Sequence, residues 1–323
     1  MRFSLTRPVK IVMLGAGGTG GHIAPHLYRL LYALDRPVRF IICDGDKVEE
    51  KNLVRQNFIP ADLGENKAKV LAERYSTVFG METEYVPDFV EDEERLKALL
   101  EPYVWKDSYY PYREITREQV ILIGAVDNNK SRQLCHRVFY QSRELIYIDS
   151  GNGEHTGQVV CGVRRGGRTL YRPIGTVYPD VLKETDKFPT ELSCAEASVS
   201  APQSIAANIT AATAVVDIIY NILALGNSRV RLVTFATPTC NVRPTLQKRR
   251  TGHGASGVRP ALRRALRAHR GLLTDGRQRR TVRAVHQDVE RHHQDLSGHA
   301  RPQELEVRRQ EGRQGQEGRP GRF

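Results

Sequence analysis

The sequence lacks the cysteine pattern of a disulfide scaffold and that of a zinc-binding module. Its 323 residues include five cysteines, an odd number, widely spaced and without a CxxC pair. Neither a four-cysteine zinc site nor a secreted, disulfide-stapled domain is therefore expected, and no signal peptide is recognised. With 40% hydrophobic and 27% charged residues, the composition is that of a globular protein with a sizeable core.

Most of the chain also lacks a net charge, although the total is +12. Residues 241–323 hold 20 Lys and Arg against 8 Asp and Glu, so residues 1–240 carry 29 charges of each sign. Lysine disappears after Lys248 while arginine continues, and aliphatic patterning fades. We interpret 241–323 as an Arg-rich tail, either a disordered basic arm or, as we favour, a sequence that is not native. Nucleic acid is not an expected partner.

Residues 1–240 alternate between short apolar runs and helical patterns, as a mostly parallel sheet requires. The expected strands are Val9–Leu14, Val38–Cys43, Thr83–Val86, Val120–Ala125 and Leu145–Asp149. The expected helices are His22–Leu34, Lys67–Phe79, Asp92–Leu100 and Lys130–Gln141. Right-handed crossovers then predict an α/β fold with a Rossmann-like, mostly parallel, doubly wound sheet.

The following residues predict an antiparallel extension of this sheet, which begins with Val159–Val163. A long apolar helix is expected over Pro202–Leu225, with proline in its first turn and Gly226 just past its end. Three polar residues interrupt this helix: Asn208, Asp217 and Asn221. A buried core helix is therefore favoured over a membrane span. We interpret Trp105–Arg117 as an insertion loop.

A glycine-rich loop joins the first expected strand to the first expected helix and matches the pattern GxGxxG. Its glycines allow the backbone to approach a phosphate closely, and the helix N-terminus offers unpaired N–H groups. Asp44, at the end of the second strand, is placed to accept ribose hydroxyls. The glycines predicted to bind a nucleotide are Gly15, Gly17, Gly18 and Gly20. An NAD-dependent dehydrogenase would begin in the same way.

Two cations and a carboxylate favour a nucleoside triphosphate over a dinucleotide as the ligand. Arg55 and Lys67 lie twelve residues apart, just beyond Asp44. Such cations suit phosphate oxygens and a departing pyrophosphate. Asp127 follows the strand Val120–Ala125, at the edge of the sheet where a carboxylate can hold Mg²⁺. Each of these residues alone is typical of a protein surface, so their joint order carries the prediction.

A series of short motifs extends this pattern along the chain. In order they are Gly15–Gly20, Asp44 with Asp46, Asn52-Leu53-Val54-Arg55-Gln56, Gly64-Glu65-Asn66-Lys67-Ala68, Asp127-Asn128 with Arg132, Ile148-Asp149-Ser150-Gly151, Gly157-Gln158-Val159 and Ser193-Cys194-Ala195-Glu196. Together they closely resemble the ThiF/MoeB/HesA superfamily, which is related to ubiquitin-activating enzymes, over about Val9–Phe235. The last motif, with Pro202-Gln203-Ser204, is most similar to the plasmid-associated (PRTRC-type) ThiF branch.

This resemblance implies that 1–240 is an ATP-binding adenylation domain. The C-terminal glycine carboxylate of a ubiquitin-like or sulfur-carrier-like protein would attack the α-phosphate of ATP in the presence of Mg²⁺. The residues implied to bind the nucleotide, besides the glycines, are Asp44, Asp46, Asn52, Arg55, Gln56 and Lys67. Asp127 is implied to position Mg²⁺ and to be essential. The resemblance also implies a cytoplasmic homodimer with a conjugating enzyme as a further partner and without membrane association.

Cys194 has two interpretations. It is either a nucleophile that takes the acyl group from the adenylate as a thioester, or a small buried residue of a loop. Two other classes of function also remain open. An NAD(P)-dependent oxidoreductase would tolerate the loss of Arg55 and Asp127. An idle scaffold of the same superfamily would be expected to have lost Arg55, Lys67 and Asp127, which this sequence retains.

Overall fold

The computed structural model describes residues 1–107, 114–183, 185–191 and 203–247. Their main sheet has nine strands, in the order β11-β10-β8-β7-β6-β1-β2-β3, with β9 paired to β8. The strands are β1 Val9–Leu14, β2 Val38–Cys43, β3 Glu84–Val86, β6 Gln119–Gly124, β7 Leu145–Asn152, β8 Thr156–Arg165, β9 Arg168–Tyr171, β10 Val230–Ala236 and β11 Asn241–Leu246. From β3 to β7 all pairs are parallel, and from β7 to β11 all are antiparallel. The predicted fold class, a mostly parallel sheet with an antiparallel extension, is confirmed.

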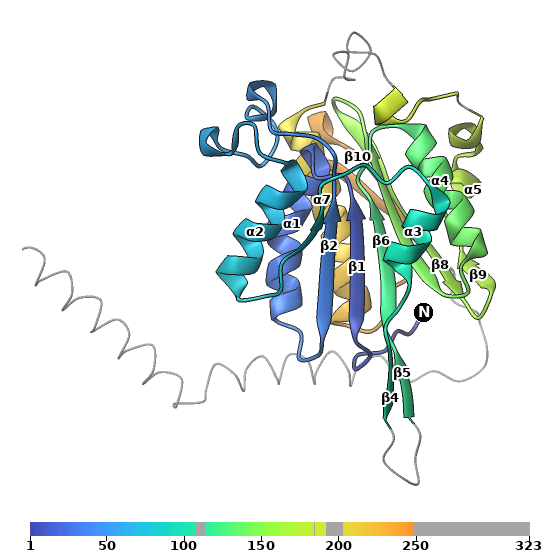
Figure 1. Ribbon diagram of the computed structural model, residues 1–323. Helices are drawn as coiled ribbons and strands as arrows, with labels where there is room; N and C mark the ends of the chain where they lie inside the picture. Colours follow the sequence, from blue (N-terminus) through green and yellow to red (C-terminus); the bar gives the residue numbers. More distant parts are fainter. Residues whose placement is uncertain (108–113, 184, 192–202, 248–323) are drawn as a thin grey trace, which may run out of the picture. The chain divides into compact units, whose positions relative to one another are not determined.

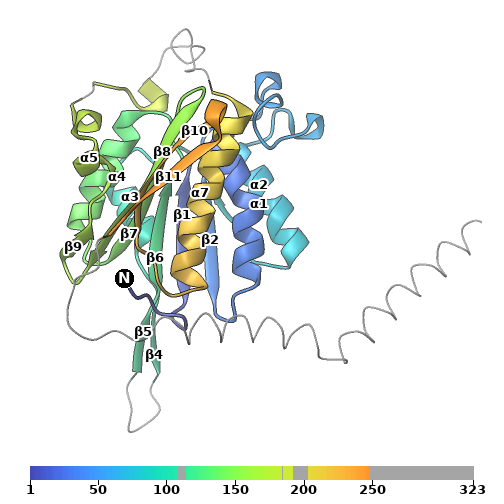
Figure 2. The same ribbon diagram turned by 180° about the vertical axis from the view of Figure 1, so that it is seen from behind.

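Helices cover both faces of this sheet (Figures 1 and 2). On one face lie α1 Gly18–Tyr32, α2 Lys67–Phe79 and α7 Ile205–Leu223, and on the other α3 Glu93–Leu100, α4 Asn129–Gln141 and α5 Ile174–Val177. Short 3-10 helices lie at Glu50–Asn52, Pro60–Asp62, Pro179–Leu182, Pro189–Glu191 and Thr237–Thr239. The three layers enclose two hydrophobic cores, one on each side of the sheet.

The central strand β1 explains why the sequence pattern identified the sheet. All six of its residues are buried. Ile11 and Met13 belong to the core under α1, α2 and α7, whereas Val12 and Leu14 belong to the core under α3 and α4. A strand covered on both faces is apolar at almost every position, and the one charged residue of β1, Lys10, is buried with its Nζ donating to the carbonyl of Glu101 at 2.7 Å. The predicted bounds of β1 and β2 agree with the structure.

Helix α7 is the longest helix of the described residues and begins three residues later than expected. The Ser204 side chain caps it, because its Oγ accepts the Ala207 N–H at 3.1 Å. This is also the one helix in the described ranges that is long and apolar enough to cross a membrane. Half of its apolar stretch is buried inside the protein. It packs against α1, β7 and β8, and Asn208 is fully buried within it. These contacts agree with the core helix that its polar residues predicted.

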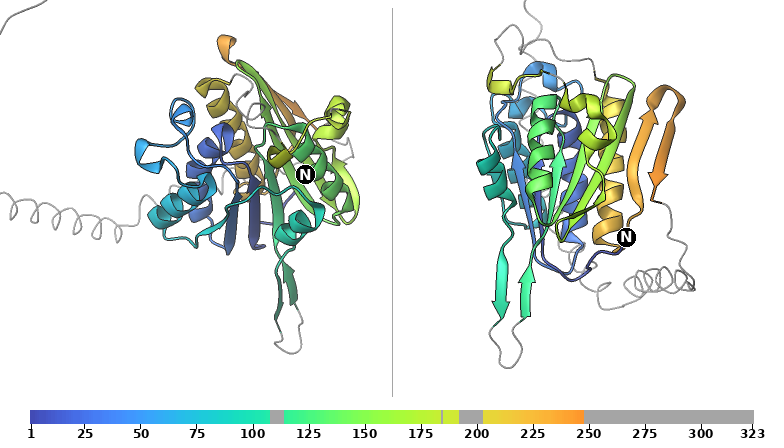
Figure 3. Two further views of the ribbon diagram at one scale, coloured as in Figure 1. Left: turned by 45° about the horizontal axis from the view of Figure 1, so that its top comes forward. Right: turned by 90° about the vertical axis from the view of Figure 1, so that its right-hand side faces the viewer.

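Two segments differ from the sequence-based expectation. The described parts of Trp105–Arg117, expected to be a loop, belong to an antiparallel pair, β4 Val104–Asp107 and β5 Glu114–Arg117. The loop assignment was wrong because valine, tryptophan, isoleucine and threonine favour an extended backbone. This pair projects from the end of the sheet opposite the glycine loop (Figures 1 and 3). Strand β11 lies past residue 240, so the sheet continues into the segment assigned to the tail.

Candidate functional site

A cavity of about 500 Å³ lies at the carboxyl ends of the parallel strands. The strand order places β1 between β2 and β6, so the loops that follow these three strands meet there. The predicted site residues that line the cavity are Gly15, Gly17, Gly18, Asp44, Asp46, Arg55, Gln56, Lys67 and Asp127. Gly20 and Asn52 are not among its lining residues. Cys194 lies outside the described residues.

The glycine loop is held so closely by its neighbours that side chains would not fit. Gly15 has a φ of +94°, a backbone conformation that favours glycine, and a Cβ there would collide with the carbonyl of Ala125. A Cβ on Gly18 would lie 2.8 Å from Cγ of the buried Asn208. Gly20 faces the carbonyl of Gly15 from the first turn of α1. The loop therefore presents its backbone to the cavity at the start of a helix.

Asp44 braces the glycine loop from the end of β2. Its Oδ2 accepts the Ala16 N–H at 2.6 Å, and its Oδ1 accepts the Asp46 N–H at 2.8 Å. Burial raises the pKa of Asp44 to about 6, although the charge of Lys67 and both backbone N–H groups act in the opposite direction. The carboxylate thus has a structural role in addition to the ribose contact that the resemblance implies.

The two predicted cations already have partners. Lys67 Nζ lies 2.8 Å from Oδ2 of Asp46, and the lysine side chain is buried whereas that of Asp46 is 54% exposed. Arg55 Nη1 donates to Oε1 of Gln203 at 2.8 Å. Both cations are thereby fixed at the cavity wall.

Two other residues of the motif that contains Arg55 have different environments. Gln56 lines the cavity opposite Gly17, and its buried Oε1 has no hydrogen-bond partner within the described residues. Asn52 is buried in its own loop, where its Oδ1 accepts the Glu49 N–H at 2.9 Å. The structure therefore places Gln56 at the site and Asn52 behind it, as a support for the segment that carries Arg55.

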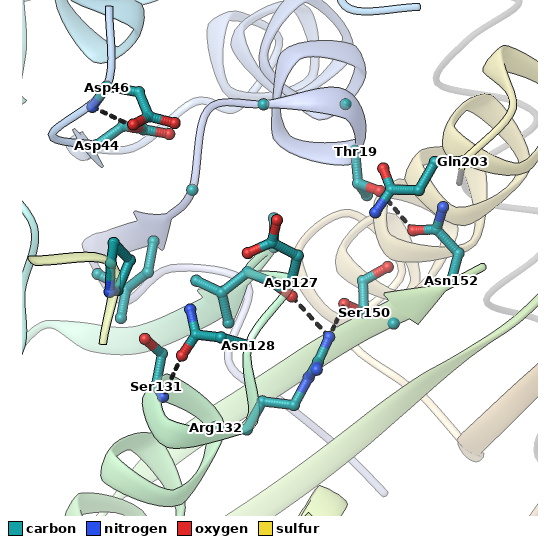
Figure 4. Close-up of a pocket in the computed structure, with 18 of the residues that line it drawn as sticks. Thr19, Asp44, Asp46, Asp127, Asn128, Ser131, Arg132, Ser150, Asn152 and Gln203 are labelled. Carbon is teal, nitrogen blue, oxygen red and sulfur yellow. Dashed lines mark hydrogen bonds between the residues drawn. The ribbon is translucent and has the colours of Figure 1, made fainter. Parts of the chain in front are cut away.

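Asp127 projects into the middle of the cavity, across from the glycine loop (Figure 4). No described residue forms a hydrogen bond or ion pair with its carboxylate, which is exposed. The next residue, Asn128, caps α4 by accepting the Ser131 N–H at 2.8 Å. Asp127 thus offers two oxygen atoms to a ligand in the cavity.

Sequence reasoning missed the polar groups that form the far end of the cavity. Thr19 Oγ1 donates to Oδ1 of Asn152 at 2.9 Å, and Asn152 Nδ2 donates to Oδ1 of Asn208 at 2.9 Å. Ser150 and Gln203 also line this end, as Figure 4 shows. The signal for Asn152 and Ser150 was the motif Ile148-Asp149-Ser150-Gly151 at the carboxyl end of a strand, which contains Ser150, directly precedes Asn152 and had received no role. Gln203 belonged to the Pro202-Gln203-Ser204 motif, to which no role at the site had been given.

These groups suit a nucleotide with its phosphates at the glycine loop and Arg55 and Lys67 beside them. They also suit a divalent cation, because the carboxylate oxygens of Asp127 are hard ligands without another partner in the described ranges. The described residues contain no group of three or more His, Cys, Asp or Glu side chains that could hold a metal ion by themselves. A bound Mg²⁺ would therefore take its other ligands from phosphate oxygens and water.

A Rossmann-type sheet with a glycine loop, two cations and a carboxylate at one edge is the arrangement found in α/β domains that bind nucleotides. The model of the ThiF family matches residues 5–255, and the chain belongs to this family. No curated protein matches the sequence.

Three solved structures illustrate the similarity in fold. PaaA is 17% identical with a TM-score of 0.49, and the match covers 74% of this chain and 64% of that chain. MccB of E. coli with AMPCPP and MccA is 15% identical with a TM-score of 0.49, over 77% and 66%. MccB of E. coli with ATP is 16% identical with a TM-score of 0.45, over 77% and 66%. The chain thus spans less than two thirds of the length of these proteins.

Proposed function

We propose that this chain uses ATP to adenylate the C-terminal carboxylate of a partner polypeptide. The observation that carries the proposal is the presence of Arg55, Lys67 and Asp127 in one cavity with the glycine loop. Membership of the ThiF family supports it. A dinucleotide would need the glycine loop and Asp44 but would leave both cations and Asp127 without a role.

The reaction joins one oxygen of the carboxylate to the α-phosphorus of ATP. The bond from that phosphorus to the oxygen bridging to the β-phosphate breaks, and pyrophosphate leaves with the electron pair. The chain contributes mainly position and charge, because this chemistry needs little covalent help. Arg55 and Lys67 would neutralise the negative charge that accumulates on the leaving pyrophosphate, and the loop N–H groups would orient the phosphates.

The contacts of the two cations fit this role. The Lys67–Asp46 pair at 2.8 Å holds the buried ammonium at the cavity, and the exposed Asp46 carboxylate can return to water at little cost. The bond to Gln203 fixes the plane of the Arg55 guanidinium and leaves its other N–H groups for phosphate oxygens. Asp127 would hold Mg²⁺, which supplies charge neutralisation at the phosphates.

The proposal extends to the partner and to the steps after adenylation. We propose a ubiquitin-like or sulfur-carrier-like protein that ends in glycine as the substrate. Transfer to the Cys194 thiol would form a thioester and release AMP, and a conjugating enzyme would then accept the acyl group. A cytoplasmic homodimer and a place in the PRTRC-type branch belong to the same proposal, each on the sequence resemblance.

Pyrophosphate release tests the proposal. The full chain is incubated with ATP, Mg²⁺ and small proteins that end in glycine, and the wild type is compared with Asp127→Ala. We expect the variant to lose about a hundredfold or more in rate while it retains part of its nucleotide affinity. Asp180→Ala is the matched control, because Asp180 is 85% exposed and its side chain pairs with Lys183 away from the cavity.

Each alternative has its own outcome. Equal rates for the wild type and Asp127→Ala would remove Asp127 from the mechanism. Binding of a nicotinamide dinucleotide in preference to ATP, unaffected by loss of Arg55, would favour the oxidoreductase. A wild type that binds no nucleotide would favour the scaffold.

A further inference from the structure

A buried network of three side chains lies behind Asp127. The Tyr147 hydroxyl donates to Oδ2 of Asp149 at 2.6 Å, and Nε of Arg132 donates to Oδ1 of the same carboxylate at 3.3 Å. Tyr147 and Asp149 are fully buried, and the Arg132 side chain is 11% exposed. We call these three residues the Arg132 clamp.

The Arg132 clamp joins the ends of two strands. Arg132 Nη2 donates to the carbonyl of Val126 at 2.6 Å and to that of Ser150 at 3.4 Å. Val126 directly precedes Asp127 in the loop after β6, and Ser150 lies near the end of β7. Figure 4 shows Arg132 beneath Asp127, with hydrogen bonds towards the loop that carries Asp127 and towards Ser150 in β7. The guanidinium therefore fixes the backbone on which Asp127 stands.

The surrounding chain leaves little freedom to this network. A Cβ on Gly124 would lie 3.0 Å from Oδ2 of Asp149, and a Cβ on Gly151 would lie 3.2 Å from Nη2 of Arg132. Burying a charged pair is costly unless its geometry and hydrogen bonds are good. Here the planar guanidinium donates to a carboxylate and two carbonyls at once, which a lysine ammonium on a flexible stem cannot reproduce.

Asp127 itself has no side-chain partner in the described ranges, so its placement depends on its backbone. We propose that the Arg132 clamp positions Asp127 for the divalent cation that accompanies ATP, with Arg132, Asp149 and Tyr147 as positioning residues. This inference rests on the proposed function, because it assumes that Asp127 binds the cation.

The test measures ATP binding by the full chain as a function of Mg²⁺ concentration, by titration calorimetry and without an acyl substrate. In Arg132→Lys, we expect the Mg²⁺ concentration for half-maximal enhancement of binding to rise about 10- to 100-fold. Arg132 also lines the cavity, and lysine keeps its positive charge there. ATP binding without Mg²⁺ should therefore stay within about twofold of the wild type, because the glycine loop, Arg55 and Lys67 are untouched. Tyr147→Phe removes one hydrogen bond and no charge, so a smaller rise in the same direction is expected.

Arg137→Lys is the matched control, with the same substitution on the same helix. Arg137 pairs with Glu93 at 2.6 Å, is 48% exposed and does not line the cavity, so wild-type Mg²⁺ dependence is expected. Wild-type Mg²⁺ dependence in a folded Arg132→Lys variant would overturn the clamp and leave the proposed function standing. If Arg132→Lys does not fold, an unchanged response in Tyr147→Phe overturns it. A wild type that binds ATP without any response to Mg²⁺ would overturn both.

Discussion

Gly18→Ala tests how closely the glycine loop is packed against α7. A Cβ at this position would lie 2.8 Å from Cγ and 2.9 Å from Oδ1 of Asn208, and closer still to Nδ2. Asn208 is fully buried, and its Oδ1 accepts a hydrogen bond from Asn152, so a movement of its side chain would break this bond. The added methyl group should therefore force a shift of helix or side chain rather than fill a gap.

The expected size of the effect follows from two opposing contributions. Overpacking of a tight interior site costs about 1–3 kcal/mol. Replacing glycine by alanine within a helix gains at most about 1 kcal/mol, and less in the first turn. We therefore expect a net loss of about 1–2 kcal/mol in the free energy of unfolding, or about 2–8 °C in Tm for a domain of this size.

Urea unfolding followed by circular dichroism measures this loss, and a double-mutant cycle identifies its cause. Asn208→Ala removes the obstructing side chain, so Gly18→Ala should cost little in that background, with a coupling of about 1–2 kcal/mol. Gly153→Ala is the matched control, because nothing lies within 4 Å of a Cβ at that position. Effects that add to within about 0.5 kcal/mol in the cycle would refute the packing argument.

Two further predictions concern charges at the cavity. The folded pKa of Asp44, about 6, lies above its ordinary 3.8, so its contribution to stability is present below pH 3.8 and lost as pH rises through 6. Relative to Asp44→Asn, which does not titrate, the wild type should lose about 2 kcal/mol of unfolding free energy between pH 4 and pH 7, and parallel pH profiles would contradict this. Lys67→Gln should raise the Kd for ATP about tenfold or more, measured by calorimetry, because a buried cation at the phosphates is lost. Lys69→Gln, a change at an exposed lysine of the same helix, should leave that Kd unchanged, and equal effects of the two would argue against a phosphate contact by Lys67.

The parallel half of the fold could be predicted from sequence because its physical signals are local. A strand buried on both faces is largely apolar, and a glycine or a helix cap follows its end, as Gly15 after β1 and the Asn128 cap of α4 after β6 illustrate. The antiparallel edge was harder to predict. All but the first residue of β11 are exposed, and the strand contains Pro244, so its pattern does not distinguish it from a tail. Only its pairing with β10 makes it a strand.

In the candidate site, the residues that come together could be predicted from the order of the strands, but the pairs that their side chains form could not. Once β1 is expected between β2 and β6, the residues that follow these strands must converge, which is why Asp44 and Asp127 could be assigned to one cavity. Which side chain pairs with which depends on contacts across long separations in sequence. Gln203 lies 148 residues from Arg55, and no local pattern indicates that they share a hydrogen bond.

The position of Asn52 behind the cavity wall and the contacts of the Arg132 clamp have a common cause. A sequence motif identifies a segment that reaches the cavity. Some side chains of that segment face the cavity, whereas others form the contacts that keep the backbone of the segment in place. Asn52 turns inward to its own loop, and Arg55, three residues later, turns outward to the cavity. In the loop after β6, Asp127 faces the cavity while Arg132 holds the backbone from below. Residues that bind and residues that position are therefore interleaved in one motif, and only the geometry of the folded chain separates them.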